Sequence, residues 1–364
     1  MSSSDLTRIP VGGSSPYEVV IGENALTEIP GLLSRSGRVA VIHCETMKDT
    51  ASDIADAVRT HGPDVDLIAV PDGEAAKNCE VATHCWTELA SLGFTRSDAI
   101  VAVGGGATTD LAGFVAATWL RGVPIVHVPT SLTAMVDAAI GGKTAINIPA
   151  GKNLVGAYHS PVGVVCDLTQ LSTLPEIELV NGLAEIVRVG FIADPSILDI
   201  IEADTEAVTT PCTPPLRDII ERSARVKAEI VTEDMRDKGR RQFLNYGHTL
   251  GHAIEQDARY QWRHGSAVSV GMCYAAELGR LTGHLDDATA ARHAEILMML
   301  GLPTTYRPDA WPDLLKAMRI DKKARGSRMR FVVLDGLGAP TVINDPDEDV
   351  LVASYAPCCR VMPV

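Results

Sequence analysis

Short β-branched runs alternate with helix-like segments in the first third of the chain, and this alternation constrains the fold more than any other feature. The strand-like runs are residues 39–43, 67–70, 99–103 and 125–128, and the helix-like segments between them are 48–61, 78–92 and 108–119. Strands separated by helices of this length pair in parallel, with right-handed crossovers. The N-terminal part is therefore expected to be an α/β domain with a parallel sheet.

The pattern becomes helical after residue 175. The expected helices are 176–193, 196–204, 214–233, 240–257, 264–282 and 286–300, and a strand-like run follows at 329–334. The 364 residues are therefore expected to form two domains. The α/β domain would span residues 1–170, and an all-α domain would span residues 171–364.

Composition excludes several classes of protein. The net charge of −14 and the absence of a basic run argue against a nucleic-acid partner. No uninterrupted apolar stretch of 18 residues predicts a membrane span, and the N-terminus lacks a secretory signal pattern. The eight cysteines form no Cys-x-x-Cys pair, which is typical of reduced thiols in a cytoplasmic protein.

Three histidines in the second half could converge on a metal ion. His248 and His252 are four residues apart, so a helix would present both imidazoles on one face. His264 follows twelve residues later, and Glu185 on another predicted helix could add a carboxylate ligand. Such a histidine pair can also lie on a surface without a ligand. Three glycines favour close backbone approach in this region, at positions 247, 251 and 265.

A glycine-rich turn in the first half could hold a dinucleotide. Gly104, Gly105 and Gly106 follow an apolar strand and precede a helix that carries Asp110. A helix N-terminus after such a turn suits a pyrophosphate, although the turn is not a Gly-x-Gly-x-x-Gly fingerprint and could simply connect two elements. Other strand-end loops are expected at the same edge of the sheet, and they carry Glu74, Lys77, Thr130 and Ser131.

The segment 137–153 interleaves glycines with charged and amide side chains. Asp137, Lys143, Lys152 and Asn153 lie within seventeen residues. Lysines on glycine loops suit the oxygens of a phosphate or carboxylate. The segment is expected between the two domains, where ligand clefts form. Arg241 stands four residues before Asn245, and a continuous helix would place both on one face with His248.

Together these motifs resemble 3-dehydroquinate synthase, a family of the sugar phosphate cyclases, from about residue 10 to 355. The motifs that carry the resemblance are Pro71-Asp-Gly-Glu74 with Lys77, Gly104-Gly-Gly106 with Asp110, Arg121-Gly122, Pro129-Thr130-Ser131, Asp137 to Lys143, Gly151-Lys152-Asn153, Gly182-Leu-Ala-Glu185, Leu244-Asn245-Tyr-Gly-His248-Thr-Leu-Gly-His252, His264-Gly265 and Asp321-Lys322-Lys323.

The resemblance implies an NAD-binding α/β domain and a helical domain that binds zinc or cobalt. It implies Glu185, His248 and His264 as the metal ligands. It implies NAD contacts at the glycine turn and at Glu74, Lys77, Asp110, Thr130, Ser131, Lys143, Lys152 and Thr173.

The resemblance also implies the residues that hold a small sugar phosphate. The implied catalytic and substrate groups are Asp137, Lys143, Asn153, Lys227, Arg241, Asn245 and His252. Phosphate and carboxylate groups would be held by Arg121, Lys152, Arg188, Lys322 and Lys323. Arg121 would reach the phosphate of the neighbouring subunit, which implies a homodimer.

The reaction that the resemblance implies converts 3-deoxy-D-arabino-heptulosonate 7-phosphate to 3-dehydroquinate and phosphate. NAD would take a hydride and later return it, the metal would acidify a substrate hydroxyl, and phosphate would leave by elimination. Ring opening and an intramolecular aldol closure would follow. His252 would move the hydroxyl proton.

Four positions depart from the family's usual residues and leave the substrate open. Arg188 replaces a lysine, Asp237 a glutamate, Ala145 a glycine and Met235 an acidic residue. An aminodehydroquinate synthase is therefore an alternative. Cyclases that act on sedoheptulose 7-phosphate are disfavoured because Asn245 and His252 are both present. A metal-dependent polyol dehydrogenase and a non-catalytic binding protein are further alternatives.

Overall fold

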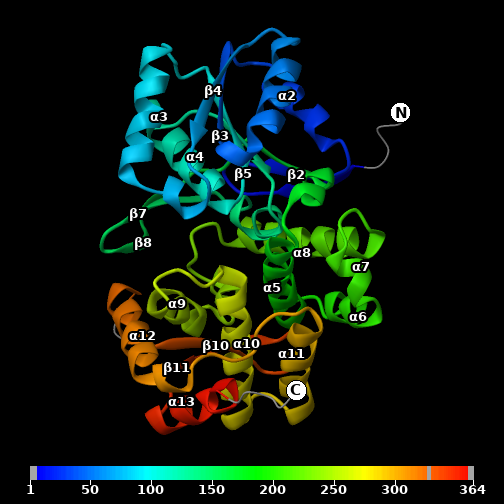
Figure 1. Ribbon diagram of the computed structural model, residues 1–364, viewed down its shortest axis with the longest axis vertical. Coiled ribbons are helices and arrows are strands. Elements are labelled where there is room, and N and C mark those ends of the chain that lie inside the picture. Colours follow the sequence, from blue (N-terminus) through cyan, green and yellow to red (C-terminus); the bar gives the residue numbers. More distant parts are fainter. Residues whose placement is uncertain (1–5, 326–328, 360–364) are drawn as a thin grey trace. The chain divides into compact units, whose positions relative to one another are not determined.

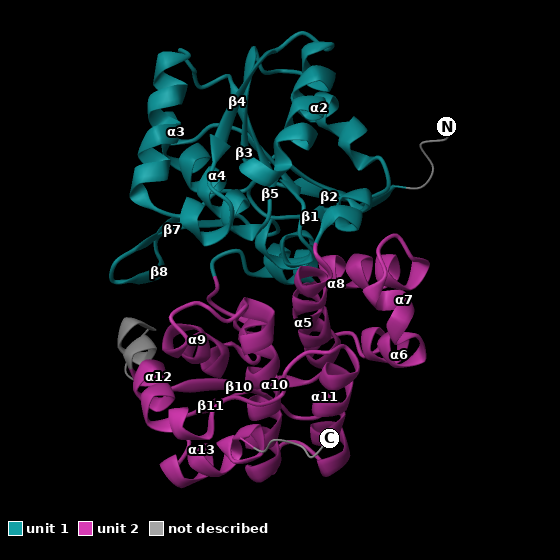
Figure 2. Ribbon diagram, viewed as in Figure 1, with its two compact units in different colours: residues 1–174, 227–236 teal, residues 175–226, 237–364 magenta. Residues whose placement is uncertain are grey.

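The computed structural model describes residues 6–325 and 329–359, and it describes no side chains from residue 320 to 328. The chain divides into two compact units, which Figure 2 shows in teal and magenta. Unit 1 contains residues 1–174 and 227–236, and unit 2 contains residues 175–226 and 237–364. The expected boundary was a single point at residues 170/171, whereas the structure also assigns the short segment 227–236 to unit 1.

Unit 1 is built on a seven-stranded sheet with the strand order β1-β2-β9-β6-β5-β3-β4. These strands are β1 (Thr7–Val11), β2 (Tyr17–Gly22), β3 (Arg38–Cys44), β4 (Asp64–Val70), β5 (Ala99–Gly104), β6 (Ile125–Pro129) and β9 (Gly163–Asp167). All neighbours pair in parallel except β1, which is antiparallel to β2. The expected parallel sheet is confirmed, and β1, β2 and β9 are strands that the alternation did not reveal.

Helices cover both faces of this sheet (Figure 1). They are α1 (Ile29–Leu32), α2 (Lys48–Arg59), α3 (Cys79–Ser91) and α4 (Gly106–Thr118), with the short 3₁₀ helices η1 (Ala25–Glu28), η2 (Glu45–Met47), η3 (Gly73–Ala76), η4 (Trp119–Arg121) and η6 (Leu168–Thr173) and the π-helical turn η5 (Ala134–Ala138). Val41 packs in the cluster with α1 and α2, while its neighbour Ile42 packs in the cluster with α3 and α4. Burial on both faces explains why the strands are nearly continuous apolar runs.

The glycine-rich segment after η5 forms a β-hairpin, which corrects the expectation of glycine loops. Strand β7 (Lys143–Ile148) pairs antiparallel with β8 (Gly151–Tyr158), with an irregularity between Ile146 and Ile148. Lys143 and Lys152 therefore stand on hydrogen-bonded strands. Their spacing is fixed by the hairpin register.

Unit 2 is helical, with one two-stranded sheet. Its helices are α5 (Glu176–Ile192), α6 (Ser196–Ala203), α7 (Thr205–Thr209), α9 (His248–Asp257), α10 (His264–Leu281), α11 (Asp287–Met299), α12 (Trp311–Arg325) and α13 (Glu348–Tyr355), with η7 (Arg240–Asn245), η8 (Pro308–Ala310) and η9 (Pro357–Cys359). Helix α8 (Pro214–Glu233) begins in unit 2, and its last turns belong to unit 1. The expected strand at 329–334 is β10 (Arg330–Leu334), and it pairs antiparallel with β11 (Pro340–Asn344). This pair is the exception to the expected all-α architecture.

The expected helix 240–257 is wrong as a continuous element. It consists of η7 and α9, which are separated at Tyr246 and Gly247. Tyr246 is extended, and Gly247 has a φ of 79°, in the left-handed region that favours glycine. Arg241 and Asn245 therefore lie on a 3₁₀ helix that precedes the histidine helix. Their expected placement on one α-helical face with His248 does not hold.

None of the helices in the described part of the chain is long and apolar enough to span a membrane.

Candidate metal and dinucleotide sites

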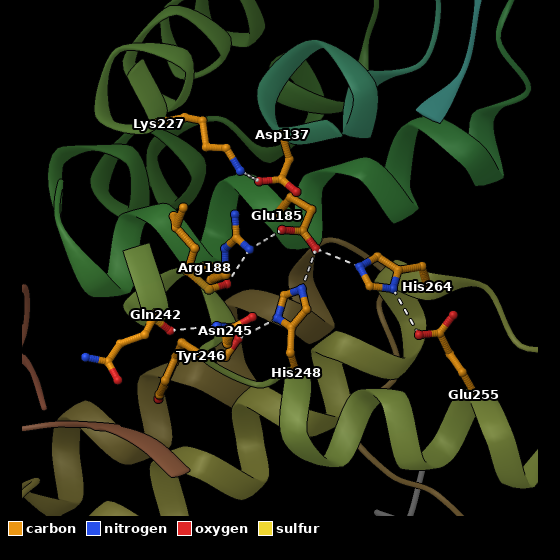
Figure 3. Close-up of polar contacts among 11 residues, drawn as sticks. Asp137, Glu185, Arg188, Lys227, Gln242, Asn245, Tyr246, His248, Glu255 and His264 are labelled. Carbon is orange, nitrogen blue, oxygen red and sulfur yellow. Dashed lines mark hydrogen bonds and ion pairs between the residues drawn. The ribbon is translucent and has the colours of Figure 1, made fainter. Parts of the chain in front are cut away.

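Three side chains from three helices of unit 2 converge on one point (Figure 3). Glu185 comes from the middle of α5, and His248 and His264 are the first residues of α9 and α10. The Oε1 atom of Glu185 lies 3.1 Å from Nε2 of His264 and 3.5 Å from Nε2 of His248. The potential ligand atoms of all three residues lie within 4.8 Å of one another.

The second nitrogen of each imidazole has its own acceptor. Nδ1 of His248 donates to the carbonyl oxygen of Tyr246 at 3.1 Å, so its Nε2 can present a lone pair toward Glu185. Nδ1 of His264 donates to Oε2 of Glu255 at 3.1 Å. Acceptors in these positions fix the orientation of metal-binding imidazoles.

The two imidazoles have opposite protonation tendencies. Burial lowers the pKa of His248 to about 3, although the charge of Glu185 opposes this shift. Burial would also lower the pKa of His264, but hydrogen bonds to Glu185 and Glu255 outweigh it and raise that pKa to about 10. A cation that binds here must displace the proton that His264 shares with the two carboxylates.

This donor set fits a divalent metal ion. Two imidazoles and one carboxylate make up the protein ligands of many catalytic zinc sites, which leave a further position for a substrate oxygen. A second possible group consists of His252, Glu255 and His264. It shares His264 with the first group, and its His252 side chain is solvent-exposed. The ring of His252 lies 5.3 Å from that of His248 and 6.1 Å from that of His264, measured between centroids.

Glycines at two helix starts make this convergence possible. A Cβ atom on Gly265 would lie 1.9 Å from the carbonyl oxygen of Asn181 on α5. A Cβ atom on Gly247 would lie 2.9 Å from the backbone nitrogen of Met272 on α10. Gly251 also packs directly on α10, at Ala267 and Val268. At these glycines the backbones of neighbouring helices lie so close that a side chain would push α5, α9 and α10 apart.

Three other residues of unit 2 that were expected at the site lie close in sequence to Glu185 or His248, and each makes contacts of its own. Asn245 donates from Nδ2 to the carbonyl oxygen of Gln242 at 3.0 Å, and Arg241 is buried on the same 3₁₀ helix. Arg188, also buried, contacts Glu185. The side chains of Lys322 and Lys323 lie outside the described residues.

In unit 1, Lys77 joins helix α4, which follows the glycine turn, to the β7–β8 hairpin. Its Nζ donates to Oδ2 of Asp110 on α4 and to Oδ1 of Asn153 on β8, both at 2.6 Å. The lysine is buried, and Asn153 has a φ of 56°. Burial raises the pKa of Asp110, although the charge of Lys77 opposes the shift. Lys77 thus contacts residues expected to serve the dinucleotide and the substrate.

Glu74 belongs to a neighbouring network. Its Oε2 accepts a hydrogen bond from Nδ2 of Asn147 at 2.6 Å, and its Oε1 lies 3.8 Å from Nζ of Lys152. The Oδ1 atom of Asn147 accepts from the backbone nitrogen of Asn153 at 3.0 Å. The hairpin therefore positions Glu74.

The glycine turn and the end of β6 are tied together. The backbone nitrogen of Thr130 donates to the carbonyl oxygen of Gly104 at 3.0 Å, and Gly105 caps the N-terminus of α4. Ser131 follows, three residues before the turn η5 begins. Thr173 is solvent-exposed at the end of η6, where its hydroxyl donates to Gln170.

Unit 1 also holds a close ion pair. Nζ of Lys227, near the end of α8, lies 2.5 Å from Oδ1 of Asp137 in η5, and the lysine is buried. Arg121, by contrast, is exposed, with a left-handed φ of 71°. The side chain of Lys143 is exposed as well.

Three of the four unusual residues lie in unit 1 or beside its segment 227–236. Ala145 is buried on β7 opposite Gly156. The sulfur of Met235 accepts a long hydrogen bond of 4.0 Å from Ser160. Asp237 has a φ of 61°, a backbone conformation that aspartate tolerates better than most residues. None of these contacts explains a change of substrate.

Sequence reasoning missed the orienting roles of three residues: Glu255, Tyr246 and Asn147. Glu255 had a usable signal, because it lies two helical turns after His248 and therefore on the same face. Tyr246 acts through its backbone carbonyl, which no side-chain pattern can reveal. Asn147 belongs to the unusual segment 137–153 that the sequence singled out, but its contact with Glu74 was not foreseen.

Comparisons with known proteins agree with this arrangement. Residues 67–181 match the family described as 3-dehydroquinate synthase N-terminal, and residues 182–324 match 3-dehydroquinate synthase C-terminal. The chain belongs to the 3-dehydroquinate synthase family. It is 57% identical over 357 residues to 3-dehydroquinate synthase of Streptomyces avermitilis, which covers 97% of this chain and 98% of the relative. The relative from Streptomyces coelicolor is 56% identical with the same coverage.

Solved structures of other sugar phosphate cyclases share the architecture of this 3-dehydroquinate synthase family member. A 2-deoxy-scyllo-inosose synthase, complexed with carbaglucose-6-phosphate, NAD⁺ and Co²⁺, has a TM-score of 0.85 and 25% identity and covers 96% of this chain and 99% of its own. A 2-epi-5-epi-valiolone synthase of Streptomyces hygroscopicus, with NAD⁺ and Zn²⁺ bound, has a TM-score of 0.86 and 25% identity. The match covers 94% of this chain and 96% of that one. An iron-containing alcohol dehydrogenase, with a TM-score of 0.70 and 13% identity, shares the fold alone.

Proposed function

We propose that the protein is a 3-dehydroquinate synthase that converts 3-deoxy-D-arabino-heptulosonate 7-phosphate to 3-dehydroquinate and phosphate. The observation that carries the proposal is the 57% identity to a synthase of that name along nearly the whole of both chains. The convergence of Glu185, His248 and His264 supports it, because a relative without catalysis has no need of this donor set. The reaction is one step of aromatic amino acid biosynthesis, and we place the enzyme in the cytoplasm.

We assign a divalent metal ion, zinc or cobalt, to unit 2 and NAD to unit 1. Glu185, His248 and His264 would hold the metal, which lowers the pKa of a substrate hydroxyl when bound. The Gly104–Gly106 turn, Glu74, Asp110, Thr130, Ser131, Lys152 and Thr173 would hold NAD, which accepts a hydride and returns it. The NAD⁺, Co²⁺ and Zn²⁺ in the cyclase neighbours support both assignments.

The chain's own polar residues would bind the substrate and move its protons. His252 is exposed beside the triad, so it can exchange a proton between a substrate hydroxyl and solvent. The Lys227–Asp137 pair holds a cation at a defined position for an anionic substrate group. Asn153, Lys143, Arg241 and Asn245 complete the proposed binding set. Charged and amide donors at fixed positions keep a flexible acyclic intermediate in a shape that can close.

We infer that the enzyme is a homodimer in which Arg121 serves the phosphate of the neighbouring subunit. The exposure of Arg121 supports an intermolecular role. Unit 1 exposes several large apolar side chains that a second copy could cover, and these are Leu120, Leu154, Val155, Tyr158 and Val162. Leu154 is 56% exposed, although it lies in a strand.

The proposal is tested by incubating the Co²⁺-loaded protein with 3-deoxy-D-arabino-heptulosonate 7-phosphate and a trace of NAD⁺. Phosphate, dehydroquinate and NADH absorbance are followed together. We expect equal amounts of phosphate and dehydroquinate, with no net NADH. No turnover by protein that holds both metal and NAD would exclude this substrate, and the amino analogue would be tried next. Stoichiometric NADH formation on a simple polyol would identify a dehydrogenase instead.

Two variants separate the proposed roles. His264→Ala should lose metal and activity together, because it removes one of three ligands. Arg121→Ala should retain the metal and raise the KM for the sugar phosphate. Full metal content in His264→Ala would show that the ligand assignment is wrong.

A further inference from the structure

Arg188 is a buried cation in the middle of α5, one turn after the proposed ligand Glu185. Its Nη1 atom lies 2.8 Å from Oε2 of Glu185 and donates to the carbonyl oxygen of Leu244 at 2.5 Å. Arg188 is only 2% exposed, and Glu185 is fully buried. A guanidinium stays charged at any physiological pH, so this contact holds a permanent positive charge against the carboxylate.

The two oxygens of Glu185 face different partners. Oε1 points to the Nε2 atoms of His248 and His264, and Oε2 points to the guanidinium of Arg188 (Figure 3). A carboxylate can bind a metal ion with one oxygen or with both. With Oε2 engaged by Arg188, only Oε1 is directed at the point where the imidazoles converge.

The hydrogen bond from Arg188 to Leu244 also restrains the backbone next to His248, the second proposed ligand. Leu244 lies near the end of η7, just before the turn that leads into α9. Tyr246 in that turn supplies the carbonyl oxygen that orients His248. Arg188 therefore links the carboxylate on α5 to the backbone that orients an imidazole on α9.

We propose that Arg188 is a positioning residue of the metal centre, which restricts Glu185 to one-oxygen ligation and fixes it relative to His248. The inference rests on the proposed metal site and assigns Arg188 a role different from holding a substrate phosphate or carboxylate. Because its guanidinium is buried and contacts both a proposed ligand carboxylate and a backbone carbonyl, Arg188 is placed to act on the substrate through the metal ligands. The side chain thus helps to fix the positions of the proposed metal ligands.

The test compares wild type with Arg188→Met, which removes the charge and the donors, and Arg188→Lys, which retains a cation. Each protein is titrated with Co²⁺ against a chelator, and its visible absorption spectrum is recorded. We expect Arg188→Met to bind Co²⁺ about 10- to 100-fold more weakly, as is typical when a partner of a metal ligand is lost. Its Co²⁺ bands should weaken because a second carboxylate oxygen raises the coordination number. Arg188→Lys should recover part of both properties.

Unchanged Co²⁺ affinity and spectrum in Arg188→Met, with a raised KM for the sugar phosphate, would overturn the proposal in favour of a substrate contact. NAD⁺ binding by unit 1 and the circular dichroism spectrum check that each variant is folded. A measurement on wild type needs no variant: X-ray absorption of the Zn²⁺-loaded protein should show one oxygen from Glu185, and a two-oxygen carboxylate would overturn the proposal. If wild type binds metal as described but does not turn over the sugar phosphate, the proposed function fails and this inference stands.

Discussion

At the residue scale, one carboxylate orients His264 so that its Nε2 faces the other proposed metal ligands. Glu255 is buried and accepts the Nδ1 hydrogen of His264 at 3.1 Å. Glu255→Gln keeps an acceptor oxygen but removes the negative charge that makes the imidazole a stronger ligand. We expect the affinity for Zn²⁺ to fall about 10- to 100-fold. Competition with a fluorescent zinc chelator measures this affinity.

The matched control for that substitution is Glu348→Gln. Glu348 is exposed and pairs with Arg319 on the surface, so its loss should leave zinc affinity at the wild-type value. Zinc affinity equal to wild type in Glu255→Gln would show that the hydrogen bond to His264 has no influence on the metal.

Residue spacing predicted some of this site and not the rest. The four-residue spacing correctly places the rings of His248 and His252 side by side, 5.3 Å apart. Glu185 was expected on another helix, but only packing of α5 against α10 brings it to His264. Glu255 was missed because an acid on an amphipathic helix usually faces solvent, and nothing local distinguishes one that meets a distant histidine.

At the element scale, close backbone contacts decide where the helices of unit 2 begin. The expected helix 240–257 has adequate local propensity, but Gly247 leaves the helical conformation where its backbone meets α10. A Cβ at that position would overlap Met272. This is a tertiary contact, so no window of local sequence could locate the break. The β7–β8 hairpin was missed for another reason: its glycines resemble a loop, and cross-strand pairing overrides their low strand propensity.

Gly265 offers a test of this backbone packing. Gly265→Ala would place a methyl group 1.9 Å from the carbonyl oxygen of Asn181, and backbone cannot move aside cheaply. The start of α10 must then shift from α5, which carries His264 away from Glu185. We expect a loss of about 1–3 kcal/mol of unfolding free energy, as is typical of overpacking. We also expect markedly weaker Zn²⁺ binding, and both are measured by urea unfolding and chelator competition.

Gly31→Ala is the control for the added methyl group. Gly31 lies in α1, and the space around its missing Cβ is open. This variant should bind Zn²⁺ as wild type does and should be no less stable, because alanine favours helix over glycine. Normal zinc affinity in Gly265→Ala would refute the idea that the α5–α10 contact positions His264.

At the scale of the whole molecule, alternation of strands and helices was enough to predict a parallel sheet and a helical second half. It could not predict the strand order, because β9 inserts between β2 and β6 after the β7–β8 hairpin has intervened. It also could not assign the segment 227–236 to unit 1. The strand order and the assignment of residues 227–236 depend on contacts between segments far apart in the sequence. The periodicity of apolar residues gives no information about such contacts.

Stability against acid is also a property of the whole fold, and buried His127 is expected to make the folded state less stable as pH falls. This residue lies on β6, and its Nδ1 has no hydrogen-bond partner among the described residues. Burial, aided by the charge of His159, lowers its pKa to about 3. The pKa of an unfolded histidine is about 6.5, so between these values the unfolded chain binds a proton that the folded chain does not. The unfolding free energy should therefore fall as pH falls, by about 1.4 kcal/mol per pH unit for this residue.

His127→Val removes this contribution and continues the apolar run of β6. Between pH 6.5 and 5, the variant should lose about 2 kcal/mol less unfolding free energy than wild type does. Urea unfolding followed by tryptophan fluorescence at the two pH values measures the difference. His84→Gln, which removes a histidine whose side chain is 52% exposed, should lose as much stability as wild type. Equal losses in wild type and His127→Val would mean that β6 accommodates a protonated imidazole. Buried His293 and His248, whose pKa values burial also lowers to about 3, would then be the next candidates for acid sensitivity.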